Sequence, residues 1–121
     1  MTPDDMKKRL KAFALRCIRL AESFPKTATG RTIGGQLIRA ATGAASNYHA
    51  SCMSRSRAEF VAKIGVAAEE ADESNFWIDF APDANLTKRS LVEGLLQEGH
   101  EILKILVASR QTAKARARSK G

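Results

Sequence analysis

The sequence predicts an all-α fold, an antiparallel up-down-up-down four-helix bundle, and three observations lead to this prediction. Apolar residues recur in steps of three and four along four stretches of the chain, which is the period of a helix face. Capping residues or prolines stand at the borders of these stretches, and the connections are short, so consecutive helices are expected to be antiparallel neighbours. Alternating apolar runs with hairpin turns, which would predict strands, do not occur.

The first helix is expected from Pro3 to Phe24. Thr2 can cap its amino end, and Asp5 completes a capping-box pattern with Thr2. A proline and the polar residues 26–30 end this helix. Its inner face is expected to consist of Met6, Leu10, Phe13, Cys17, Leu20 and Phe24.

The second helix is expected from Thr32 to Met53. Its start is the least defined boundary because two consecutive glycines, each costing about 1 kcal/mol within a helix, follow it closely. Residues 40–46 are almost all small, which predicts a close approach by a neighbouring helix. The expected inner row is Ile33, Leu37, Ala41, Ala44, Tyr48 and Cys52.

The third helix is expected from Arg57 to Phe80, because Ser56 and Glu59 form a second capping box and Pro82 can close the helix. Its inward-facing residues are expected to be Phe60, Ile64, Ala67, Ala71 and Ile78.

The fourth helix is expected to begin after Thr87 as cap, with Leu86 packed on Leu91, and to end at about Gln111. Its apolar residues are Leu91, Leu95, Leu96, Ile102, Leu103, Leu106 and Val107. The bundle domain therefore comprises residues 1–111. Residues 112–121 are basic and lack an apolar face, so they are expected to form a mobile tail.

The charge of the chain is its first functional hint. The net charge is +7, and residues 31–58 carry four arginines and no acid, whereas residues 59–83 carry one lysine and seven acids. A basic surplus attracts polyanions. No apolar run is long enough to cross a membrane, so a cytoplasmic protein without a membrane partner is expected. Cys17 and Cys52 are expected to be free, small apolar side chains rather than a disulfide.

Two groups of basic residues are candidates for contacts with nucleic acid. Lys7, Arg9, Lys11 and Arg16 recur at helical spacings in the first helix, and a merely solvated helix face is an equally good interpretation of them. The tail residues Lys114, Arg116, Arg118 and Lys120 have no intervening acid, which is typical of an arm that binds phosphates. Such contacts give little sequence specificity.

The acidic residues 69–73 could be imagined as a metal site. However, a bundle di-metal site needs Glu-x-x-His motifs, and the sequence has none. If the second and third helices form a hairpin that turns near Ser56, Arg39 lies beside Glu73, with Glu70 and Asp72 within a turn. We therefore expect a structural ion-pair cluster and neither a metal nor another cofactor.

A catalytic site is not expected, because His49 has no assignable nucleophile and orienting acid around it. Aromatic and apolar residues instead exceed what one inner stripe can bury. The excess predicts a second apolar face and hence self-association. The expected interface residues are Leu15, Ile18, Phe76, Trp77 and Phe80.

Residues 30–80 carry a family pattern: Gln-Leu-x-Arg, a run of small residues, Asn-Tyr, a Ser-Arg-Ser turn, Glu-Phe, and an acidic block before tryptophan. Its members here are Gln36, Leu37, Arg39, Asn47, Tyr48, Arg55, Ser56, Glu59, Phe60, Glu69 to Glu73 and Trp77. In this pattern the chain resembles the four helix bundle proteins, also known as ribosomal RNA intervening-sequence proteins. The resemblance implies a homo-oligomer, with pentamers among relatives. It also implies kinship with the accessory variability determinant of diversity-generating retroelements, which binds nucleic acid and a reverse transcriptase.

Together these observations predict a non-enzymatic, homo-oligomeric bundle that acts as a scaffold or adaptor on RNA or DNA. The alternative is a protein–protein interaction module in which the basic charge serves only solubility. A bundle enzyme or metal protein is the third and least supported class.

Overall fold

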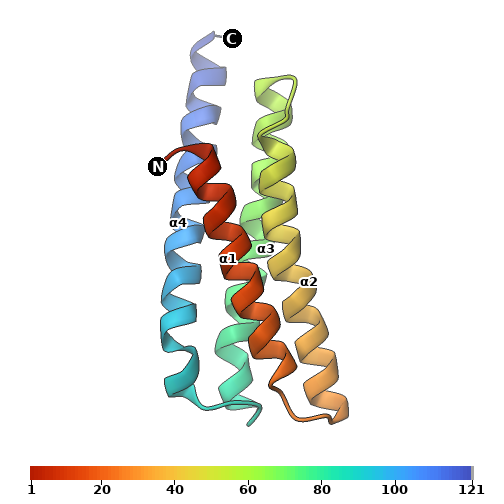
Figure 1. Ribbon diagram of the computed structural model, residues 1–121. Helices are drawn as coiled ribbons and strands as arrows, with labels where there is room; N and C mark the ends of the chain where they lie inside the picture. Colours follow the sequence, from red (N-terminus) through yellow and green to blue (C-terminus); the bar gives the residue numbers. More distant parts are fainter. Residues whose placement is uncertain (121) are drawn as a thin grey trace.

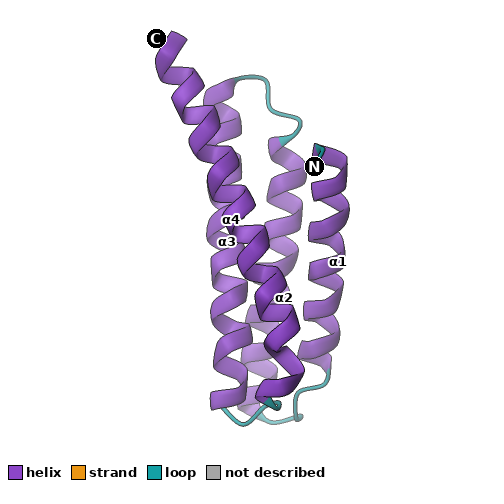
Figure 2. Ribbon diagram, turned by 90° about the vertical axis from the view of Figure 1, so that its left-hand side faces the viewer, coloured by secondary structure: helices purple, strands orange, loops and turns teal. Residues whose placement is uncertain are grey.

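The computed structural model describes the backbone of residues 1–120 and the side chains of residues 1–118. This part of the chain forms an all-α bundle of four helices without a strand: α1 (Pro3–Glu22), α2 (Ala28–Ser51), α3 (Arg57–Asp83) and α4 (Arg89–Lys120). Figure 1 shows the four helices side by side, with the chain turning back at each short connection, and Figure 2 shows the same bundle from its side. Among the described residues, no helix has both the length and the apolar character that crossing a membrane requires.

The amino ends of three helices are capped by side chains. The predicted capping box of Thr2 and Asp5 is confirmed in both directions, with distances of 3.0 and 3.1 Å. Ser56 likewise accepts from the backbone N–H of Glu59 at 3.1 Å. The predicted start of α2 at Thr32 is wrong: Thr27 caps this helix by accepting from the N–H of Gly30 at 3.1 Å.

Gly30 explains why α2 begins four residues earlier than expected. A Cβ at this position would lie 2.0 Å from the carbonyl oxygen of Pro25, so only glycine allows the first turn to pack against the preceding connection. The polar composition of residues 26–30 resembles a loop, although most of it is the first turn of a helix.

The predicted end of α3 at Phe80, with Pro82 closing the helix, is also wrong, because the helix continues through this proline to Asp83. A proline in the last turn removes only one backbone hydrogen bond. The helix ends in a Schellman motif around Asn85, whose φ is 59°. In this motif the N–H of Leu86 donates to the carbonyl of Ala81, and the N–H of Asn85 donates to that of Pro82, each at 3.0 Å.

α4 differs most from the prediction. It starts at Arg89 rather than directly after Thr87, and Leu91 is 71% exposed, so Leu91 does not belong to the inner row. Its predicted end at Gln111 is wrong, since the helix continues to Lys120 and extends beyond the other helices at the upper end of Figure 1. The basic residues after 111 therefore stand on a helix.

One continuous apolar core joins the four helices. α1 packs mainly on α2, and its contact with α4 is the smallest between neighbouring helices. α3 and α4 approach closely at Gly99, where an added Cβ would lie 1.9 Å from the side-chain oxygen of Asn75. The largest fully buried apolar side chains are Leu10, Phe13, Leu37, Ile64, Ile78, Val92, Ile102 and Leu106.

Candidate nucleic-acid interface

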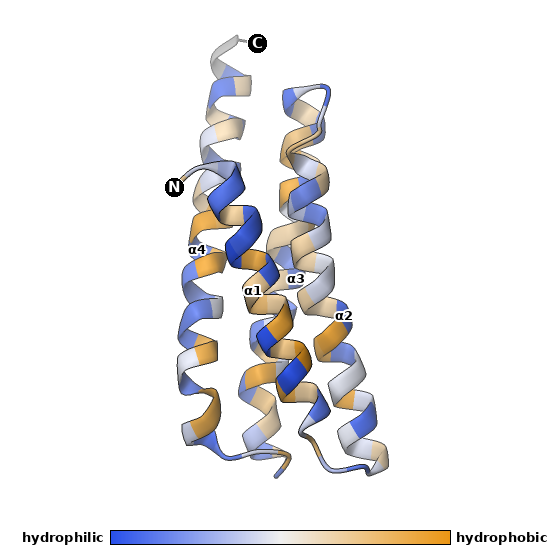
Figure 3. Cartoon of the chain, viewed as in Figure 1, coloured by the Kyte–Doolittle hydropathy of each residue, from blue (hydrophilic) through white to orange (hydrophobic). Residues whose placement is uncertain are grey.

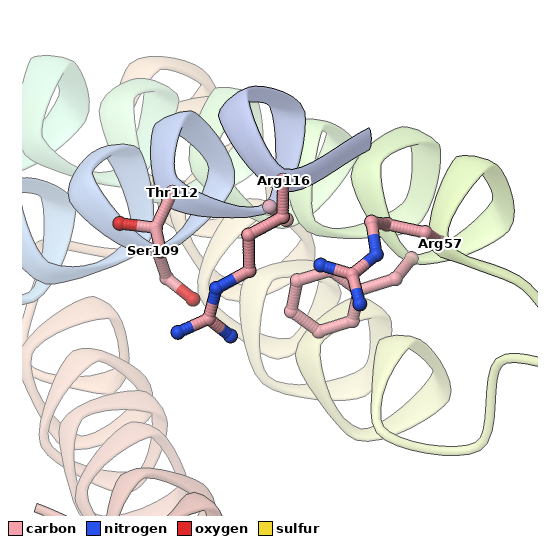
Figure 4. Close-up of a pocket in the computed structure, with 6 residues that line it drawn as sticks. Arg57, Ser109, Thr112 and Arg116 are labelled. Atoms are coloured by element: carbon pink, nitrogen blue, oxygen red, sulfur yellow. The ribbon is translucent and has the colours of Figure 1, made fainter. Parts of the chain in front are cut away.

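A cleft of about 510 Å³ lies between the first turn of α3 and the last turns of α4. Figure 4 shows the guanidinium groups of Arg57 and Arg116 reaching toward the same space. The hydroxyl of Ser109 lies near the guanidinium group of Arg116. The ring of Phe60, half-buried, forms the apolar wall. The six lining residues are Arg57, Phe60, Ser109, Thr112, Ala113 and Arg116.

This combination of groups suits a phosphodiester. A guanidinium presents a planar fork of donors that matches two phosphate oxygens, and hydroxyl groups add weaker donors. Arg57 is also the first residue of α3, where the helix dipole contributes a partial positive charge. The accessible part of an aromatic ring beside a phosphate site can stack on a base without reading its identity. The cleft can therefore hold a nucleotide segment without sequence recognition.

The electrostatic surroundings of the cleft are positive. Beyond Glu101 the sequence contains no acid, so the whole carboxyl half of α4 has only basic charges. The nearest acid on α3, Glu59, is 2.8 Å from Lys63, and the hydrogen bond from Lys63 lowers the pKa of Glu59. Arg110 covers Gly65, where an added Cβ would lie 3.0 Å from its Nε.

The residues predicted on the carboxyl tail lie at this end of α4. Arg116 lines the cleft, Lys114 is half-buried and Arg118 is exposed. The side chain of Lys120 lies outside those that the structure describes.

The predicted residues of the first helix do not join this site. Arg9 is held by Glu98 of α4 through two hydrogen bonds of 2.7 and 2.8 Å, so its guanidinium links helices instead of facing a ligand. Lys7 and Lys11 line a different groove, between α1 and α2. Arg16 is exposed, and its guanidinium lies near Gly94 of α4.

The expected ion-pair cluster between α2 and α3 does not form as such. The predicted hairpin register is supported, because Glu70 packs against Gly43, where an added Cβ would lie 3.1 Å from Oε2. However, Arg39 donates to Gln36, and the ion pairs within 4.0 Å among the described residues do not join it to Glu70, Asp72 or Glu73. Burial and repulsion from Glu73 raise the pKa of Glu70, although Arg39 opposes this shift.

The predicted interface residues lie in two places. Leu15 is 44% exposed and lines the groove between α1 and α2 together with the half-buried Ile18. The aromatic residues cluster on α3, where the ring of Phe76 lies 4.8 Å from that of Trp77 and 5.8 Å from that of Phe80, centroid to centroid. Phe76 and Phe80 are exposed, whereas Trp77 packs partly on the core.

Arg57 and Phe60 line the cleft, although the sequence pattern did not predict either of them as a site residue. The sequence feature that could have indicated Arg57 is its position directly after Ser56, the residue predicted to cap the third helix. In the part of the chain that the structure describes, no cluster of three or more His, Cys, Asp or Glu side chains lies together as metal ligands would.

Comparison with known proteins relates this chain to a protein family and to solved structures. A family model described as 23S rRNA-intervening sequence protein matches residues 5–108. A crystal structure from Bacteroides thetaiotaomicron, of a protein of unknown function from the S23 ribosomal protein family, superposes with a TM-score of 0.83. It is 23% identical in sequence, and the match covers 92% of this chain and 99% of the other, so it supports the fold alone. No curated protein matches this chain.

Proposed function

We propose that this chain, which belongs to the 23S rRNA-intervening sequence protein family, is a non-enzymatic, homo-oligomeric bundle that binds nucleic acid as a scaffold or adaptor. The observation that carries the proposal is the cleft of Arg57, Phe60 and Arg116, which lies within the acid-free half of α4. It combines donors for phosphate with an aromatic surface for a base. The reversal of the chain at each short connection further supports an antiparallel up-down-up-down arrangement, in which this end stays accessible.

The chemistry of the site indicates how binding works. Guanidinium and ammonium groups on α4 displace counterions from the phosphates, so the affinity depends steeply on salt. Among the described residues, those that line the cleft do not form an element that contacts base edges in a groove of the nucleic acid. Binding therefore depends on the phosphate backbone of the nucleic acid and on base stacking rather than on base sequence. The exposed apolar residues Leu15, Phe76 and Phe80 support self-association, which multiplies the number of such sites.

A titration of fluorescent single-stranded RNA, duplex RNA and duplex DNA at several salt concentrations tests the proposal. Two changes are made in the site: Arg57→Gln/Arg116→Gln, and deletion of residues 112–121. A matched control, Lys26→Gln/Arg31→Gln, removes two exposed basic residues from the opposite end of the bundle. Circular dichroism confirms that each variant is folded.

The wild-type protein and the control are expected to bind with the same log–log salt slope. The double arginine variant is expected to lose about 1.5–2 units of slope, and the deletion about 3–4 units, since each lost phosphate contact removes about 0.7–0.9 unit. Absence of binding at low salt, or equal loss in the control, would refute the nucleic-acid role. The exposed Phe76 and Phe80 then favour the second candidate, a module that binds another protein.

A further inference from the structure

The groove between α1 and α2 combines an apolar floor with a basic rim. It has a volume of about 450 Å³ and lies along α1 over three turns. Its floor contains Leu15 and Ile18, while Lys7, Lys8 and Lys11 stand at its upper part. Figure 3 shows strongly hydrophilic first turns in α1 and, in its second half, apolar residues interrupted by hydrophilic ones. Neither helix contributes an acid between Asp5 and Glu22 or anywhere along residues 28–51.

The solvent-facing side of α3 has the complementary character. Its stripe consists of Val66, Glu69, Glu73, Phe76 and Phe80, which recur in alternating steps of three and four residues. Val66, Phe76 and Phe80 are 41%, 56% and 40% exposed. Between Lys63 and Lys88 the sequence has six acids and no base, so nothing on α3 neutralises the acids of this stripe. A stripe of this spacing is the pattern with which one helix packs on others.

The two faces also match in register. α1 ends at Glu22 and α3 at Asp83, at the same end of the bundle, and both run toward that end. Counted back from these ends, Leu15 and Phe76 both lie seven residues away. Lys11 and Asp72 both lie eleven residues away, and Lys8 and Glu69 fourteen. Leu15 therefore stands level with an apolar residue of α3, and Lys8 and Lys11 stand level with acids of α3.

We infer that the α3 stripe of one copy docks into the α1–α2 groove of the next copy. The inference rests on the homo-oligomeric part of the proposed function and names the surfaces that form the contact. The two faces are different, so the contact is heterologous and repeats around a ring. A rotation about an axis parallel to the bundle keeps α1 and the neighbouring α3 parallel and level. This operation brings Leu15 beside Phe76 and Lys8 beside Glu69.

A second copy fits these faces because each needs what the other provides. An apolar groove with lysines at its rim is complementary to an apolar ridge flanked by carboxylates. The exposed face of α3 is such a ridge. The nucleic-acid cleft lies between α3 and α4 at the end of the bundle, so assembly through these faces leaves it open. The lysines of α1 then serve assembly rather than phosphate binding.

Reversal of charge on each face tests the inference. The groove variant is Lys8→Glu/Lys11→Glu. The α3 variant is Glu69→Lys/Asp72→Lys, which changes one acid of the stripe and the neighbouring Asp72. All four side chains are exposed, so the fold is expected to persist. Sedimentation velocity is expected to show an oligomer for the wild type and at least a tenfold weaker self-association for each variant alone. Mixing the two variants, or placing all four substitutions in one chain, is expected to restore assembly.

A monomeric wild type would overturn both the oligomer and the docking, while the nucleic-acid titration would still decide the rest of the proposed function. An oligomer that both variants leave intact would overturn the docking alone. The register is checked by oxidative cross-linking. Leu15→Cys/Phe76→Cys is expected to give covalent multimers, whereas Leu15→Cys/Val66→Cys, displaced by about 15 Å along α3, is expected to give none. The opposite result would refute the register.

Discussion

Arg9 and Glu98 form the main polar link between α1 and α4, the pair of neighbouring helices with the least apolar contact. Both side chains are about three-quarters buried. The hydrogen bond from Arg9 lowers the pKa of Glu98 below its ordinary value of 4.5, and the same bond raises the pKa of Arg9. Arg9 was predicted to contact nucleic acid, because sequence periodicity places it on the outside of the first helix. The periodicity does not show which helix lies beside it.

Glu98→Gln is expected to lower the free energy of unfolding by about 1 kcal/mol at pH 7, the upper end of the range for ion pairs near a surface. A carboxylate with a depressed pKa contributes stability above its unfolded pKa and loses it as the pH falls through the folded pKa. Urea unfolding at pH 7 and pH 3 measures this difference. A gap between wild type and variant that persists undiminished at pH 3 would contradict the assignment. Glu93→Gln, an exposed acid on the same helix, serves as the control.

At the scale of the element, the end of α3 is set by Asn85 rather than by Pro82. Asn85→Gly is expected to leave the free energy of unfolding unchanged or raise it by a few tenths of a kcal/mol, because glycine adopts a positive φ without strain. Asn85→Val is expected to lower it by about 1–2 kcal/mol, since a β-branched residue resists this conformation. Thermal unfolding followed by circular dichroism measures both. Equal stability of the valine variant would contradict the role of this cap.

The elements that sequence predicts well are those in which local and tertiary preferences agree. The capping residues Thr2 and Ser56 lie directly before regular apolar stripes, so both starts are correct. Where tertiary packing decides, the prediction fails: Gly30 is read as a loop residue, but its close contact with Pro25 starts a helix. In α4 the inner row runs through Val92 instead of Leu91, and the helix starts one residue later than a cap at Thr87 implies.

At the scale of the whole molecule, the candidate site depends on long-range contact. Arg57 and Arg116 belong to consecutive helices but stand far apart in the sequence, at the start of one helix and near the end of the next, and nothing in the local pattern pairs them. The tail was recognised as basic from composition alone. Its helical structure was missed because residues 114–120 lack an apolar stripe, although alanines at 113, 115 and 117 favour a helix that has already begun.

Cys17 reports on the opening of the whole bundle. It is fully buried, and burial raises the pKa of its thiol to about 12. In a Cys52→Ser variant, labelling of Cys17 by a thiol reagent at pH 8 is therefore expected only through unfolding. The rate in low urea is expected to follow the unfolding equilibrium measured by circular dichroism. Complete labelling within minutes in native buffer would contradict a closed core.

The overhang of α4 has a consequence for the proposed binding of nucleic acid. In a ring whose axis is parallel to the helices, every overhang ends on the same rim. A strand captured by one copy meets the next site at a high effective concentration, so weak individual contacts combine into avidity. Long RNA would then dissociate slowly even where a single site releases a short oligonucleotide at once, and the length of a bound strand, rather than its sequence, would select the ligand.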